Sequence, residues 1–173
     1  SIGDRRTAID RLIDRCKYLP VVQRQRLVDA VAQAARVTLP HDLMMSSEQV
    51  RLLRQGGMQI GAHTMSHPIL LRLDDEGARR EIEDSRSMLQ ALLQEPVELF
   101  AYPNGRPGRD YDERAVAIVR DLGFRAAVST HPAAVHPGCD RFQLPRFTPW
   151  DRSALRFGAR MLQNLWQSRP GRQ

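Results

Sequence analysis

"VELFAYPNGRPGRDYDERAVAIVRDLGFRAAVST", residues 97–130, contains the order of elements that decides the fold. Its first apolar run, 97–103, is typical of a buried strand that ends in a turn. Residues 112–123 are predicted to form a helix, and residues 124–130 a second strand. Because a helix separates the two strands, they are expected to pair in parallel. The stretch therefore predicts an α/β fold.

The segments on either side continue this alternation. Upstream, residues 58–63 are predicted to form a short buried strand, which lies between a helix over 46–57 and a long amphipathic helix over 74–95. Downstream, residues 142–147 are predicted to form a final short strand and residues 153–167 a closing helix. Strands that alternate with helices predict a parallel sheet or barrel, whose active sites lie at the carboxyl ends of the strands.

Two of these helices carry signals for their first residue. Ser46 followed by Gln49 has the spacing of a capping box, and a Gly-Gly pair ends that helix. The long helix is capped by Asp74 or Asp75. Its predicted inward-facing residues are Ile82, Met88, Leu89, Leu92 and Leu93.

Two further helices are predicted at the beginning of the sequence. Apolar residues recur at helical spacing within residues 4–20, where Pro20 ends the pattern, and again over residues 21–37, before Pro40. These helices are expected to form a hairpin or cap that precedes the main domain. The predicted organisation is therefore a helical insertion or cap over residues 1–40 and an α/β domain over residues 41–173.

The composition is that of an ordinary folded protein, with 173 residues, 42% hydrophobic and 27% charged. The net charge of +6 comes from arginine, since Lys17 is the sole lysine. This charge is spread along the chain without interleaved aromatic residues, so nucleic-acid binding is not expected. No apolar run has the length of a transmembrane segment. Cys16 and Cys139 fit either reduced thiols, which favours a cytoplasmic location, or one disulfide.

A pair of histidines lies at one of the predicted strand ends, within "GMQIGAHTMSHPIL", residues 57–70. His63 follows the strand directly, and Pro68 disfavours helical backbone at His67. One turn brings positions i and i+4 to the same face, which lets two imidazoles share a metal ion. Zinc at a catalytic site requires a third protein ligand and an open position. The alternative is that both are ordinary histidines at the edge of a core.

Four stretches resemble the polysaccharide deacetylases, the NodB-homology family of carbohydrate esterases. "IGAHTMSHP" resembles the family's H-[ST]-x-x-H motif, and "FAYPNGRPGRDYD" resembles the loop after the next strand. "GFRAAVST" and "LPRFTPWD" are similar to later segments of the family. The resemblance covers roughly residues 42–152 and includes the order of the elements.

The resemblance implies a distorted (β/α) barrel, of which this chain forms a part. It also implies an activity that removes acetyl groups from N-acetylated sugars of a polysaccharide or oligosaccharide. The reaction would use a divalent metal, which we interpret as zinc. The resemblance implies that His63 and His67 are metal ligands and that Thr64 orients the turn between them. It also implies that Tyr102 and Pro103 belong to a wall of the sugar site and that the backbone amide of Asn104 donates to the oxyanion. Separately, we predict that Arg146 is a substrate contact that anchors a sugar or a carboxylate.

The sequence departs from the family pattern where the chemistry needs carboxylates. The family's T-F-D-D motif, which supplies the base and the third ligand, has no counterpart before the histidines. The acidic residues among the first 62 are Asp4, Asp10, Asp14, Asp29, Asp42 and Glu48, and none is paired or follows a strand-like run. The late histidine of the family is also missing from "QLPRF", and His131 and His136 are expected to be surface residues of a loop.

We therefore expect the chain to be the carboxyl-terminal part of a polysaccharide deacetylase domain that begins inside an insertion. Alone, it should bind zinc weakly and hydrolyse little substrate. Two alternatives stay open at this point: a non-catalytic α/β module that binds a glycan or a protein, and, less favoured, an arginine-rich nucleic-acid binder.

Overall fold

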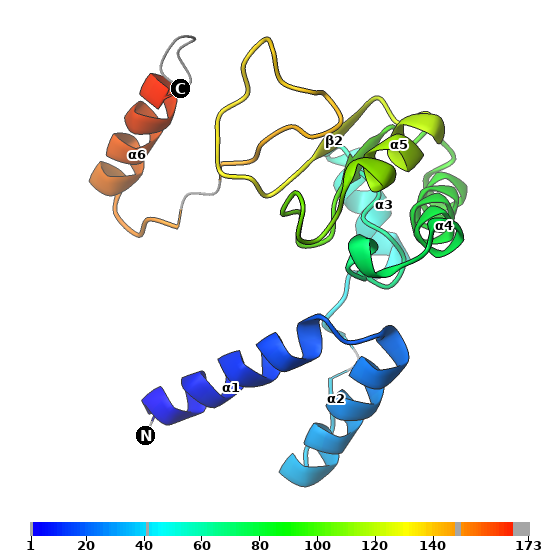
Figure 1. Ribbon diagram of the computed structural model, residues 1–173, viewed down its shortest axis with the longest axis vertical. Coiled ribbons are helices and arrows are strands. Elements are labelled where there is room, and N and C mark those ends of the chain that lie inside the picture. Colours follow the sequence, from blue (N-terminus) through cyan, green and yellow to red (C-terminus); the bar gives the residue numbers. More distant parts are fainter. Residues whose placement is uncertain (1, 41, 148–149, 168–173) are drawn as a thin grey trace. The chain divides into compact units, whose positions relative to one another are not determined.

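The computed structural model describes residues 2–40, 42–147 and 150–167 (Figure 1). The chain forms two compact units, residues 1–58 and residues 59–173. This division falls after the third helix, whereas the sequence placed a boundary after residue 40. The Thr-Pro pair inside "LPRFTPWD" lies outside the described residues.

The first unit contains the predicted helical hairpin. Helix α1 (Ile2–Lys17) and helix α2 (Val21–Ala35) pack against each other, and Pro20 stands at the N-cap of α2. Proline suits this place because the first amide of a helix has no partner within the helix. Apolar side chains of both helices line one cavity, among them Leu12, Cys16, Val28 and Val31.

Helix α3 (Ser47–Gln55) begins at the predicted capping box. The Gln49 amide donates to Ser46 Oγ at 3.3 Å, and the Ser46 amide donates to Gln49 Oε1 at 2.8 Å. This reciprocal pair satisfies two amides that the helix leaves without an internal partner. The sequence prediction for this helix start is confirmed.

The second unit is organised by the predicted strand–helix–strand segment. Strand β1 (Leu99–Ala101) pairs in parallel with strand β2 (Ala126–Val128), and helix α5 (Glu113–Asp121) connects them. Asp112 caps α5, since its side chain accepts from the Ala115 amide at 3.1 Å. The predicted partial α/β fold is confirmed.

The two outer strands are shorter than predicted. Upstream, a single residue, Ala62, forms a parallel bridge to Phe100 on one edge of the sheet, and the backbone has positive φ at Gly57 and again at Thr64. On the other edge, Leu144 forms a bridge to Val128. The next residue is a proline, which has no amide hydrogen to extend the pairing. Each outer strand is thus reduced to one bridge.

Helix α4 (Asp75–Leu93) follows a short 3-10 turn, η1 (Leu70–Arg72). Asp74, not Asp75, is the N-cap, and its side chain accepts from the Gly77 amide at 2.8 Å. The prediction that Met88 faces inward is wrong, because its side chain is 50% exposed. Ile82 is buried and Leu89 packs on the core. Around the helix axis, Met88 lies about 120° from Ile82 and about 100° from Leu89, so its side chain points away from this face.

The core of the second unit lies between the sheet and helices α4 and α5. Its largest buried side chains are Leu70, Ile82, Val97, Phe100, Tyr102, Tyr111, Val116 and Val119. Helix α6 (Ala154–Gln167) is amphipathic, and its apolar side chains Leu155, Leu162, Leu165 and Trp166 are exposed. Over the described ranges, every helix is too short or too polar to cross a membrane.

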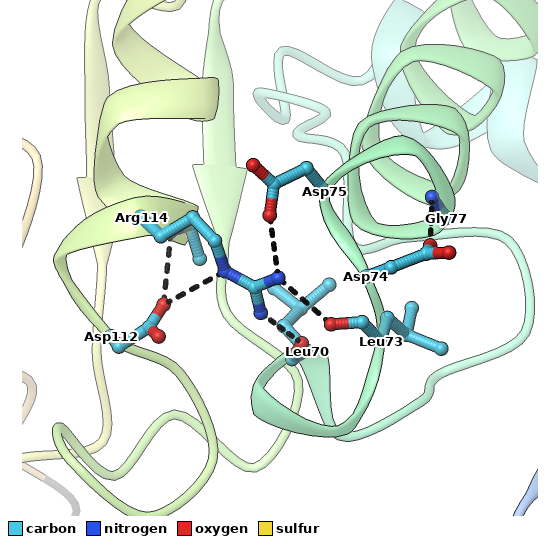
Figure 2. A network of polar contacts seen from close by, with 8 residues as sticks. Leu70, Leu73, Asp74, Asp75, Gly77, Asp112 and Arg114 are labelled. Carbon is cyan, nitrogen blue, oxygen red and sulfur yellow. Dashed lines mark hydrogen bonds and ion pairs between the residues drawn. The ribbon is translucent and has the colours of Figure 1, made fainter.

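The start of α5 is tied to the start of α4 by one side chain, Arg114 (Figure 2). Its Nη1 donates to the Leu73 carbonyl oxygen and to Asp75 Oδ1, each at 2.8 Å, and its Nη2 donates to the Leu70 carbonyl oxygen at 3.2 Å. The two carbonyls belong to the turn that joins the histidine segment to α4. Arg114 therefore fixes the far end of that segment.

Arg114→Ala is expected to destabilise the second unit by about 2–3 kcal/mol, because two backbone carbonyls lose a charged donor. Urea unfolding followed by near-ultraviolet circular dichroism of the buried tyrosines measures this loss. Arg80→Ala is the matched control, since Arg80 pairs with Glu76 on the exposed face of α4 and should cost less than about 0.5 kcal/mol. Equal costs for the two variants would contradict the anchoring role.

Candidate functional site

The two histidines of the motif lie side by side at one edge of the sheet. The ring centroids of His63 and His67 are 4.9 Å apart, and the planes are at 72°. Both residues are exposed. The backbone reaches this arrangement through positive φ angles of 64° at Thr64 and 54° at His67, not through a helical turn. The predicted proximity of positions i and i+4 is present, with a different local conformation.

The His63 ring is oriented by strand β1. Its Nδ1 lies 2.6 Å from the Ala101 carbonyl oxygen. A carbonyl oxygen only accepts, so the hydrogen is assigned to Nδ1, and the neutral ring keeps its lone pair on Nε2. A ring held in this way by a backbone carbonyl is the usual arrangement of a metal-ligating histidine. The contact therefore leaves Nε2 of His63 as the ring nitrogen that could bind a metal ion.

Helix α4 holds the turn between the histidines. Glu81 Oε2 accepts from the amides of Met65 and Ser66, each at 2.9 Å, and Glu81 Oε1 accepts from Ser66 Oγ at 2.6 Å. One turn further along α4, Ser85 Oγ accepts from the His63 amide at 3.4 Å. The Thr64 hydroxyl donates within the turn, to the carbonyl of His63 at 2.5 Å.

Sequence reasoning missed Glu81 and Ser85. The available signal was their place on the inward face of a long amphipathic helix: Ser85 is only 3% exposed, and both flank the buried Ile82. A polar side chain on such a face needs a polar partner, and the partner here is the backbone of the histidine turn.

The two imidazoles are the side chains here that could bind a metal ion together. Within the described part of the chain, no group of three His, Cys, Asp or Glu side chains is placed to hold one. The aspartate pair after the histidines has other partners, because Asp74 caps α4 and Asp75 pairs with Arg114. Zinc sites in proteins have three or four protein ligands. His63 and His67 fit two of these ligands and do not by themselves complete such a site.

The loop after β1 lies next to the strand end that orients His63. Asn104 and Gly105 have φ angles of 58° and 70°. Thr130, just after β2, holds them, since its amide donates to the Gly105 carbonyl at 2.8 Å and its hydroxyl to the Asn104 carbonyl at 2.5 Å. A Cβ on Gly105 would lie 2.8 Å from the Thr130 nitrogen, so glycine is required there. Among the described backbone hydrogen bonds, the Asn104 amide donates to none.

Tyr102 and Pro103 of the same loop are buried. The Tyr102 ring stacks on Tyr111 with centroids 3.8 Å apart, and its hydroxyl donates to the Phe142 carbonyl oxygen at 2.9 Å. Burial raises the pKa of Tyr111 to about 12, and it raises the pKa of Tyr102 further. Both phenols are therefore neutral packing groups, and a contact of Tyr102 or Pro103 with substrate stays a prediction.

The loop after β2 contains the remaining candidates. Arg146 is exposed, and its amide donates to the His131 carbonyl oxygen at 3.0 Å. His131 and His136 are exposed, as the sequence predicted. Cys139 and Cys16 are free thiols. A role for Arg146 as a sugar or carboxylate anchor stays a prediction.

Comparison with known proteins identifies the family to which this chain belongs. The sequence model described as polysaccharide deacetylase matches residues 21–127, and the chain belongs to this family. The chain is 26% identical over 97 residues to the "Putative polysaccharide deacetylase YxkH" of Bacillus subtilis (strain 168), a match that covers 56% of this chain and 33% of that protein.

Solved structures of deacetylases share the fold. The Streptococcus pyogenes deacetylase PplD in complex with acetate aligns with a TM-score of 0.64 at 22% identity, over 75% of this chain and 53% of that one. IcaB from Ammonifex degensii aligns with a TM-score of 0.56 at 20% identity, over 73% of this chain and 54% of that one. The chain thus spans a third to about half of the length of these relatives.

Proposed function

We propose that this chain carries the histidine side of a metal-dependent deacetylase site that acts on N-acetylated sugars of a polysaccharide. The observation that supports the proposal is the pair His63 and His67, whose rings are 4.9 Å apart at a strand end, with Nδ1 of His63 held by a backbone carbonyl. In this proposal both histidines hold a divalent metal, most simply zinc, which when bound supplies Lewis-acid polarisation of the acetyl carbonyl.

The other proposed roles belong to the loops at the same strand ends. The Asn104 amide would donate to the oxygen of the acetyl group as negative charge develops on it. The loop 100–105 would form one wall of the sugar site, and Arg146 would anchor a hydroxyl or carboxylate of the glycan. Thr64 would keep the turn between the histidines in place through its bond to the His63 carbonyl.

Titration of the isotopically labelled chain with an N-acetylated chitooligosaccharide tests where substrate binds. Amide chemical shifts of Asn104, Gly105 and the histidine turn are expected to change together, because the proposed acetyl site lies between them. Changes restricted to helix α6, or none at millimolar ligand, would contradict the proposed substrate site.

The chain alone is expected to hydrolyse little or nothing, because two imidazoles leave a metal ion with too few ligands among the described residues. The Glu81 carboxylate beside them is engaged in three hydrogen bonds to the turn, so it is not placed to act as the base. We propose that a longer chain supplies the family's missing aspartates. Acetate release from chitooligosaccharide with added zinc should not exceed that of His63→Ala. A turnover of about 1 per second or more, ordinary for an enzyme, would refute this prediction.

A second candidate is a glycan-binding module without catalysis, which is favoured by the absence of a third ligand among the residues that the structure describes. The two candidates differ in what zinc does. A deacetylase site requires the ion between His63 and His67 for tight binding of the acetyl group, so chelation should weaken oligosaccharide binding. For a binding module, oligosaccharide affinity should be the same with zinc and with a chelator.

A further inference from the structure

The Glu81 carboxylate holds the turn between the histidines. Its two oxygens accept three hydrogen bonds, from the Met65 amide, the Ser66 amide and the Ser66 hydroxyl, at 2.6–2.9 Å. The donors lie 15 and 16 residues away in sequence, so this contact joins helix α4 to the site and is not local to the helix. Hydrogen bonds to an ionised carboxylate are stronger than those between neutral groups.

The turn needs such support because of its backbone. Thr64 and His67 both have positive φ angles, which residues with a Cβ adopt at an energetic cost. A strained conformation persists only where the surroundings enforce it. Ser66, which makes two of the bonds to Glu81, directly precedes His67. The conformation that places the His67 ring next to His63 therefore depends on the contact with Glu81.

A second residue of α4, Ser85, holds the backbone of the first histidine, His63. Ser85 is four residues after Glu81 and accepts from the His63 amide at 3.4 Å. Positions i and i+4 of a helix share one face, so one face of α4 fixes both the His63 backbone and the turn that leads to His67. Arg114 has a different role, because it binds the carbonyls of Leu70 and Leu73, which follow the histidines in the chain, and not the turn between them (Figure 2).

We propose that Glu81 is a positioning residue that sets the separation of the two imidazoles and thereby the metal affinity of the site. This inference rests on the proposed function, because it assumes that His63 and His67 bind a metal ion whose affinity depends on the distance between the two rings. Glu81 does not act as the third ligand here, because all three bonds of its carboxylate go to the turn and no three-residue group of potential ligands occurs in the described residues.

Three variants of the full chain separate the possible roles of this side chain. Glu81→Ala removes all three acceptor contacts. Glu81→Gln keeps the shape: its amide oxygen can accept from both backbone amides, and its NH2 can donate to the Ser66 hydroxyl, which then accepts. Glu83→Ala is the matched control, because it removes the same charge from an exposed position of the same helix.

The experiment measures zinc affinity by titration calorimetry together with proton contacts between the two imidazole rings by NMR. We expect Glu81→Ala to weaken zinc binding about tenfold or more and to lose the ring contact. Glu81→Gln should stay within about threefold of the parent and keep the ring contact, and Glu83→Ala should equal the parent. Far-ultraviolet circular dichroism checks that each variant retains its helices.

Three results would overturn the proposal. Unchanged zinc affinity and ring contact in Glu81→Ala would show that the turn keeps its conformation alone. A Glu81→Gln variant as weak as Glu81→Ala would show that the charge, not the position, matters. If Glu83→Ala lost as much zinc affinity as Glu81→Ala, the cause would be a general electrostatic effect of α4 and not the contact with the turn. If the parent chain does not bind zinc, the proposed function fails, and the ring contact still tests the positioning role by itself.

Discussion

Tyr102→Ala is expected to destabilise the second unit by about 3–5 kcal/mol. Tyr102 is 2% exposed, stacks on Tyr111 and contacts Phe100 edge-on with centroids 5.2 Å apart. Removal of the ring leaves a cavity at the carboxyl end of β1, where the sheet meets the loop before α5. Single domains are stable by only about 5–15 kcal/mol, so much of the stability is lost. Urea unfolding followed by near-ultraviolet circular dichroism measures the change.

Tyr102→Phe is the control for this prediction. It keeps the ring and removes the hydroxyl that donates to the Phe142 carbonyl, so it should cost about 1–2 kcal/mol. The same variant tests the sequence-based assignment of Tyr102 to substrate, because a sugar contact through the hydroxyl would weaken oligosaccharide binding. If Tyr102→Ala cost no more than Tyr102→Phe, the stack would not contribute to the core as argued.

His63→Ala and His67→Ala are each expected to raise the zinc dissociation constant by about a hundredfold, equivalent to about 3 kcal/mol. The physical reason is that each variant leaves a single imidazole, and one ring does not retain zinc against water. Titration calorimetry on the purified chain after treatment with a chelator measures the constant. The double variant should show no binding above that of unfolded peptide.

His131→Ala serves as the control, since His131 is exposed on the loop after β2 and away from the pair in sequence. It should bind zinc as the parent does. If His131→Ala lost as much affinity as His63→Ala, the ion would bind elsewhere and the proposed metal role of the pair would be wrong. If all three variants matched the parent, zinc binding would not involve histidine.

Sequence alone predicted the parts of the fold that depend on local patterns. Strand β1, helix α5 and strand β2 follow from an apolar run, a helical pattern and a second apolar run, and in the structure the cap of α5 is a side chain three residues from the amide that it accepts from. The outer strands were overestimated, because apolar composition does not reveal where the backbone turns away. Met88 was misplaced because an amphipathic helix has more apolar positions than its core contact uses.

The sequence by itself determined the family and which two histidines are candidates, since both depend on residue types at fixed spacing along the chain. Only the tertiary structure decided how His63 and His67 meet. Their approach requires two left-handed residues, a carbonyl from β1 and a carboxylate from α4. The carbonyl lies 38 residues from His63 along the chain, and the carboxylate lies 15 and 16 residues from the amides that it accepts from. No local pattern records such a contact, because hydrogen bonds between distant segments form only when packing of the core brings α4 and β1 to the same edge.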